Sequence, residues 1–186
     1  MKNYYRTILF VIAWAWCPLF THAQVSADAI SNDLLLESVK EVLGTEQPVT
    51  WLQKPISDKI KESLKGKLKI KAGLPDTLHL GSIQTDEGVR YIIPDIAPSK
   101  SEKYSYVLYL NSYKEVVDVD VLEYRENYGY EIDYDYFRDQ FHGKKDPRKV
   151  RFQRTIQNIS GATISARSLT YSVRDLLALM QKIQLP

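Results

Sequence analysis

Apolar residues follow helical spacing in the first part of the chain. Between residues 27 and 43 they recur every three or four positions, and Gly44 comes directly after them. This spacing predicts an amphipathic helix that the glycine ends. The stretch "SDKIKESL", residues 57–64, predicts a second short helix with Ser57 or Asp58 as its N-terminal cap.

The pattern changes after this helical N-terminal segment, which we place at residues 24–75. Three stretches rich in β-branched and aromatic residues follow, at 88–94, 104–110 and 116–124. The third alternates valine with aspartate, which is typical of a half-buried strand. Only five residues separate it from the second, so we expect the two to form an antiparallel hairpin.

The last part of the chain returns to helical spacing. Apolar residues from Leu169 to Ile183 recur at three and four positions and predict a C-terminal helix. The sequence therefore predicts an α+β fold, in which an antiparallel sheet with flanking helices follows a short helical N-terminal segment. We expect residues 76–186 to form the main domain.

The first 23 residues have the pattern of a secretory signal. Two basic residues precede the apolar run "ILFVIAWAWCPLF", and small residues precede a plausible cleavage point after Ala23. Pro18 interrupts the run, which is too short for a typical membrane span. A lipid anchor at Cys17 is the alternative, but bulky tryptophans stand where such sites need small or aliphatic residues. We therefore expect export, with the segment either removed or kept as an anchor.

Composition narrows the possible functions. Removal of Lys2 and Arg6 with the signal leaves equal numbers of basic and acidic residues, so nucleic-acid binding is not expected. Cleavage also removes Cys17, the only cysteine, and with it any disulfide or thiolate site. His79 and His142 are too far apart in sequence to predict a metal site.

A turn of small residues stands just before the predicted C-terminal helix, in the stretch "SGATIS" at residues 160–165. Gly161 and Ala162 would let a ligand approach the backbone, and the amides that begin a helix favour a phosphate. Hydroxyl groups come from Ser160, Thr163 and Ser165. The residues alone leave two interpretations open, a simple serine or threonine helix cap and a phosphate-binding turn.

The same stretch resembles the S-G-A-T signature of FMN-binding domains, such as those found in the Na+-translocating quinone reductase and in the Rnf complex. In that family a flavin transferase attaches FMN to the motif threonine through its phosphate. The resemblance implies FMN bound covalently at Thr163. It also implies that the phosphate is surrounded by Ser160, Gly161, Ala162 and Ser165.

Two upstream blocks extend the resemblance, which covers roughly residues 76–183. "LEYRENYGYEI", residues 122–132, is similar to a family segment in which a glutamate and a glycine precede the flavin site. The matching residues, together with a tyrosine expected near the flavin ring, are Glu126, Gly129 and Tyr130. "FRDQFHGKKDP", residues 137–147, resembles the F-x-x-Q-F-x-G-K run of the family. Gln157 departs from the pattern, because the family often has aspartate three residues before the motif serine.

The resemblance implies an electron carrier or redox subunit rather than a stand-alone enzyme, with no catalytic residue and no metal ligand of its own. We expect it in the periplasm or on the outer side of the inner membrane. Its partners would be a flavin transferase for maturation and redox proteins, including membrane-bound ones. The alternative is a non-redox module of the same fold that binds a phosphate-bearing ligand or another protein. A hydrolase using Ser160 or Ser165 is disfavoured, since the chain lacks a G-x-S-x-G elbow.

Overall fold

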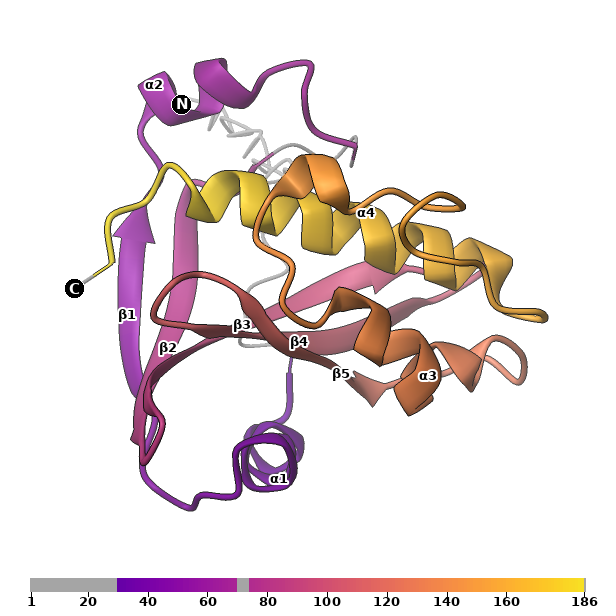
Figure 1. The fold of residues 1–186 in the computed structure, drawn as a ribbon, viewed down its shortest axis with the longest axis horizontal. Coiled ribbons are helices and arrows are strands. Elements are labelled where there is room, and N and C mark those ends of the chain that lie inside the picture. The colour runs from indigo at the N-terminus through magenta and orange to yellow at the C-terminus, as the bar shows by residue number, and fades with distance from the viewer. Residues whose placement is uncertain (1–29, 70–73, 186) are drawn as a thin grey trace, which may run out of the picture.

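Five antiparallel strands form one sheet with helices on both of its faces (Figure 1). The computed structural model describes residues 30–69 and 74–185. The strands are β1 (Thr50–Pro55), β2 (Thr77–Thr85), β3 (Gly88–Pro98), β4 (Lys103–Asn111) and β5 (Val116–Glu123). Each strand pairs with its neighbour in sequence, in the order β1-β2-β3-β4-β5. The predicted α+β fold is confirmed.

Two hydrophobic clusters lie on opposite faces of the sheet because successive side chains of a strand point to opposite sides. Ile92 and Val107 pack toward α1 (Asn32–Leu43), whereas Ile93 and Leu108 belong to the larger cluster that includes α4 (Thr163–Met180). Figure 1 shows α1 and α4 on the two sides of the sheet. β4 is buried from residue 104 to 110, which explains why its sequence is apolar without alternation.

The predicted strands correspond to β3, β4 and β5, and the predicted hairpin joins the last two. β1 and β2 are additions to the predicted sheet. All six residues of β1 are exposed or half-buried, so the strand has no buried face for hydrophobic periodicity to mark. β1 lies inside the segment expected to be helical and pairs with β2 from Thr50↔Ser82 to Pro55↔Thr77, so the sheet continues across residue 75.

The predicted helices are present. α1 ends at Gly44, whose φ of 63° is the left-handed conformation that glycine adopts at helix ends. α2 (Asp58–Leu64) begins after Ser57, whose hydroxyl accepts a hydrogen bond from the amide of Ile60. The C-terminal helix is α4, and it runs along the face of the sheet opposite α1.

Four short helical segments connect β5 to α4. They are η2 (Tyr130–Asp133), α3 (Asp135–Arg138), η3 (Asp139–Phe141) and η4 (Pro147–Lys149). Phe137 and Phe141 are fully buried, and their rings meet edge to face with centroids 5.7 Å apart. This connection lies beside β5 and leads the chain to the start of α4.

No helix within residues 30–69 or 74–185 is long and apolar enough to cross a membrane. The predicted signal peptide, residues 1–23, and Cys17 lie outside the described residues.

The C-terminal end of α4 provides a test of how the helix is held. Lys114 donates hydrogen bonds from Nζ to the carbonyl oxygens of Met180 (2.9 Å) and Ile183 (2.7 Å). Replacing Lys114 by Met leaves these carbonyls unpaired and should lower the free energy of unfolding by about 1–3 kcal/mol. Urea denaturation measures the change. The exposed Lys182→Met is the control, and an equal effect of both substitutions would contradict the capping role.

Candidate functional site

The small-residue turn leads directly into α4, and the start of this helix has no side-chain cap. Gly161 adopts a φ of 86°, Ala162 occupies the N-cap position, and the helix begins at Thr163. No side chain among the described residues accepts a hydrogen bond at this cap. The amides of the first turn therefore lack the partner that a capping serine or threonine would supply. Of the two interpretations of the turn, the simple side-chain cap is wrong.

The hydroxyl of Thr163 lies at the surface of this open helix end. Ser160, Gly161 and Thr163 are exposed, whereas Ala162 is buried beneath them. Asn158 donates a hydrogen bond from Nδ2 to Thr163 Oγ1 over 2.9 Å. An approaching group can therefore reach both the hydroxyl and the backbone of the turn.

Ser165 has a different environment from the other residues of the turn. Its side chain is buried, and its hydroxyl hydrogen-bonds to Ser99 Oγ (2.8 Å) and Tyr124 OH (2.7 Å). Ser99 and Tyr124 also bond to each other over 2.8 Å. This hydroxyl cluster of Ser99, Tyr124 and Ser165 ties the end of β3 and the end of β5 to the first turn of α4. A phosphate contact of Ser165 stays a prediction.

Gly129 brings the second predicted block against the first. Its φ of 97° suits glycine, and a Cβ atom there would lie 2.4 Å from Tyr124 OH and 3.3 Å from Ser165 Oγ. Tyr124 OH also donates to the carbonyl of Tyr128, one residue before the glycine. The glycine of the family pattern is thus needed for close packing of the two blocks.

Glu126 contacts another part of the molecule. Its Oε1 accepts hydrogen bonds from the amides of Ser101 (2.7 Å) and Glu102 (3.0 Å), in the turn between β3 and β4. These amides lower the pKa of the Glu126 carboxyl. The carboxylate is therefore fixed on this turn, and its predicted place near the flavin ring stays a prediction.

Exposed tyrosines form an aromatic surface on η2 and α3. The Tyr130 ring meets the Tyr134 ring with centroids 6.0 Å apart, and Tyr134 meets Tyr136 at 5.8 Å. Their exposed fractions are 49%, 44% and 60%. Such ring faces suit stacking with a flat aromatic ligand. Tyr130, the predicted ring contact, is one member of this surface.

Glu131 connects the aromatic surface with the turn, and no motif of the sequence marked it. A Cβ atom on Gly161 would lie 3.0 Å from Glu131 Oε1, so the carboxylate lies against the backbone of the turn. The other oxygen, Oε2, is buried and has no hydrogen-bond partner among the described residues. A buried acceptor without a donor is rare in folded proteins and often marks a functional site.

The run F-x-x-Q-F supports the turn from its other side. Gln140 Oε1 accepts a hydrogen bond from the amide of Gln157 over 2.5 Å, while Phe137 and Phe141 fix the segment in the core. The side chain of Gln157 is exposed and donates to the carbonyl of Arg154 (3.4 Å). All three blocks that were recognised in the sequence thus meet around the start of α4.

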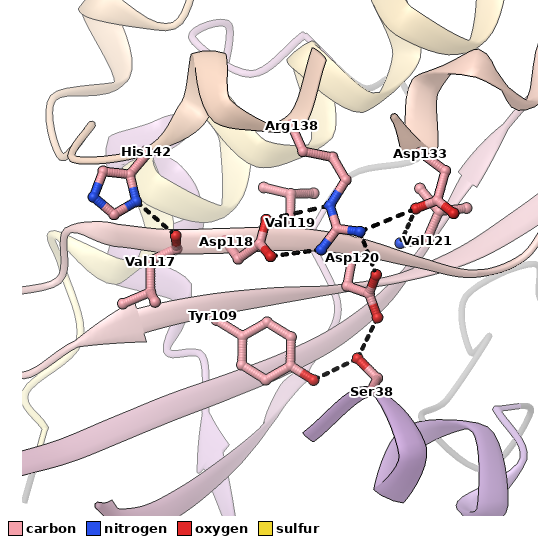
Figure 2. Close-up of polar contacts among 10 residues, drawn as sticks. All are labelled: Ser38, Tyr109, Val117, Asp118, Val119, Asp120, Val121, Asp133, Arg138 and His142. Carbon is pink, nitrogen blue, oxygen red and sulfur yellow. Dashed lines mark hydrogen bonds and ion pairs between the residues drawn. The ribbon is translucent and has the colours of Figure 1, made fainter. Parts of the chain in front are cut away.

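A charge cluster holds η2 and α3 on the sheet, as Figure 2 shows. Arg138 forms ion pairs with Asp118 (2.5 Å) and Asp120 (2.9 Å) of β5 and with Asp133 of η2 (3.4 Å). Asp118 and Asp120 both pair with Arg138 although they are consecutive charged positions of one strand. The guanidinium therefore anchors the segment that carries Tyr130 and Glu131.

The same cluster continues to the opposite helix. Ser38 of α1 donates a hydrogen bond to Asp120 and also bonds to Tyr109 OH over 2.6 Å (Figure 2). Burial raises the pKa of Tyr109 above its ordinary value. Polar contacts thus link α1, the sheet and the site-bearing segment.

No group of histidine, cysteine, aspartate or glutamate within residues 30–69 and 74–185 is arranged to hold a metal ion. A surface groove lies between the end of α1 and the β2–β3 hairpin, and none of the predicted site residues lines it. The candidate site is therefore the surface at the start of α4, bounded by the turn, Glu131 and the tyrosines.

Comparison with known proteins identifies this site as that of an FMN-binding domain. Residues 101–178 match the model of the FMN-binding domain family, a range that includes every predicted site residue. The resemblance inferred from the sequence is confirmed. Comparison with curated proteins gives no match.

The fold is similar to that of a solved crystal structure from Parabacteroides distasonis, the NqrC-type component of its Na(+)-translocating NADH-quinone reductase. The two chains share 14% sequence identity with a TM-score of 0.51, over 78% of this chain and 82% of the other. At this identity the likeness establishes a shared fold.

The charge cluster predicts a pH dependence of stability. Burial, with a smaller contribution from Asp120, raises the pKa of Asp133 to about 6 against the opposing effect of Arg138. The folded state therefore holds this proton to higher pH than the unfolded state, and ionisation destabilises the fold as pH rises from about 4 to 6. Asp133→Asn should remove this effect.

We expect Asp133→Asn to be more stable than the unsubstituted protein at pH 7.5 by about 1 kcal/mol. This magnitude allows for solvent screening, because the side chain is 45% exposed. The difference should disappear near pH 4, where both states are protonated. Urea denaturation at both pH values measures it, with the exposed Asp139→Asn as control. A pH-independent difference would contradict the assignment.

Proposed function

We propose that the chain is an exported electron-transfer module whose FMN is attached to Thr163 through a phosphoester. The observation that carries this proposal is the exposed threonine hydroxyl at a helix start without a side-chain cap. Free amides and the helix dipole favour a phosphate there. Export rests on the predicted signal peptide.

The residues of the turn fit the phosphate part of FMN. Gly161 adopts a left-handed conformation and presents no side chain, while Ser160 is exposed beside it. Arg167 is exposed and follows Thr163 by four residues, which places both on one face of α4. Its guanidinium would offset the charge of the phosphoester. Sequence reasoning missed Arg167, although its spacing from the threonine was readable.

The neighbouring surface fits the rest of FMN. The buried Oε2 of Glu131 needs a donor, and the ribityl chain carries hydroxyl groups that can donate to it. Tyr130 and Tyr134 present ring faces on the same side as Glu131, where an isoalloxazine ring can stack. When bound, FMN supplies the electron-transfer chemistry, and the protein positions the ring and tunes its potential.

The exposure of the turn also fits maturation by a second protein. A flavin transferase must bring its flavin donor to Thr163 Oγ1, and nothing among the described residues covers this atom. A covalent link would retain the flavin outside the cytoplasm. The similar structure belongs to a Na(+)-translocating NADH-quinone reductase, which supports redox partners in a membrane complex.

Replacement of the threonine tests the proposal. After coexpression with a flavin transferase, the intact mass should increase by one FMN less one water, and the adduct should lie on the peptide that contains Thr163. Thr163→Val keeps the side-chain shape but removes the nucleophile, so it should carry no covalent flavin. Thr163→Ser should keep part of it, and Thr50→Val on the exposed edge strand is the control.

An unmodified protein, or an adduct that survives Thr163→Val, would overturn the covalent assignment. Binding of a phosphate-bearing ligand by Thr163→Val without any flavin in the unsubstituted protein would instead support the non-redox alternative.

Glu131 provides a second test, on stability. Glu131→Met removes a buried unpaired oxygen and should stabilise the flavin-free protein by about 1–2 kcal/mol. In the flavin-loaded protein the same substitution removes a partner of FMN, so the gain should vanish or become a loss. Urea denaturation of both forms measures the difference. An equal effect in both forms would show that Glu131 does not contact the flavin.

A further inference from the structure

The hydroxyl of Thr163 has one polar partner among the described residues, and that partner is Asn158. Nδ2 of Asn158 donates to Oγ1 over 2.9 Å, so a side chain before the turn reaches across it to the first residue of α4. Both residues are exposed, and neither is fixed by burial. The contact therefore sets the direction of the hydroxyl where backbone packing alone does not.

This hydrogen bond constrains what the hydroxyl can do. A threonine hydroxyl has one hydrogen to donate and two lone pairs. When Asn158 donates to one lone pair, the hydrogen and the second lone pair remain for an incoming group. The amide N–H of asparagine cannot take up a proton, so Asn158 orients the oxygen without activating it.

We propose that Asn158 is a positioning residue for attachment of the flavin, an inference that rests on the proposed function. In the transfer step, Thr163 Oγ1 attacks the phosphorus of the FMN half of FAD. The Oγ1–phosphorus bond forms, and the bond from phosphorus to the AMP oxygen breaks. AMP leaves with the electron pair, and the hydroxyl proton passes to a base of the transferase. No oxidation or reduction occurs.

The neighbouring residues do not take this role. Gln157 stands at the position where the family often has aspartate, but its side chain donates to the carbonyl of Arg154. Glu131 lies against Gly161, and no carboxylate of the described residues contacts Thr163 Oγ1. The chain thus orients the nucleophile through Asn158 and leaves deprotonation to the transferase.

The test follows adduct formation over time. Flavin-free protein is mixed with purified flavin transferase, FAD and Mg2+, and the intact mass is recorded at intervals. Asn158→Ala should slow attachment about tenfold or more because the hydroxyl loses its preferred direction. Gln157→Ala, an exposed neighbour without a contact to Thr163, should leave the rate unchanged. Melting curves of both variants should match that of the unsubstituted protein.

Asn158→Asp separates positioning from a merely structural role. Its carboxylate keeps the shape of asparagine, accepts the hydrogen of Thr163 and can act as a base. Attachment should therefore recover as pH rises above about 4, the ordinary aspartate pKa, and give a pH profile that the unsubstituted protein lacks. A rate as low as that of Asn158→Ala at every pH would overturn the inference.

The outcomes distinguish the two proposals. If the unsubstituted protein gains no FMN, the covalent function fails, and this inference fails with it. If the unsubstituted protein and Asn158→Ala gain FMN at the same rate, the covalent function stands and only the role of Asn158 is overturned.

Discussion

The start of α4 is the constraint on which the rest of the site depends. Ala162 cannot cap a helix with its side chain, so the first-turn amides stay available while Thr163 lies directly beside them. A helix end in this state favours a phosphate through its hydrogen-bond donors and its dipole. The small residues of the turn are thus explained by what must approach the backbone.

Two polar clusters maintain this arrangement across long distances in sequence. The hydroxyls of Ser99, Tyr124 and Ser165 join the first turn of α4 to the ends of β3 and β5. Arg138 fixes the segment that carries the aromatic surface against β5 through its ion pairs with aspartates. Removing one partner of such a buried group costs far more than an exposed pair contributes. These clusters therefore keep the turn, Glu131 and the tyrosines in register with one another.

Sequence reasoning predicted the elements that bury a face and the motif that carries chemistry. β3, β4 and β5 followed from β-branched and aromatic runs, and Gly44 marked the end of α1. β1 was missed because its residues are mostly exposed, so burial leaves no period in the sequence. Glu131, Tyr124 and Asn158 were missed for another reason: their roles arise from contacts that the fold creates, which local spacing does not encode. The buried position of Ser165 likewise depends on Ser99, which lies 66 residues earlier.

The central claim is that the phosphate of FMN lies at the start of α4. It is tested most directly by ¹H–¹⁵N correlation spectra of the protein produced with and without a flavin transferase. The account predicts that the largest changes fall on the amides of residues 161–165, followed by those of residues 129–131. Changes concentrated instead at the groove between α1 and the β2–β3 hairpin would contradict it.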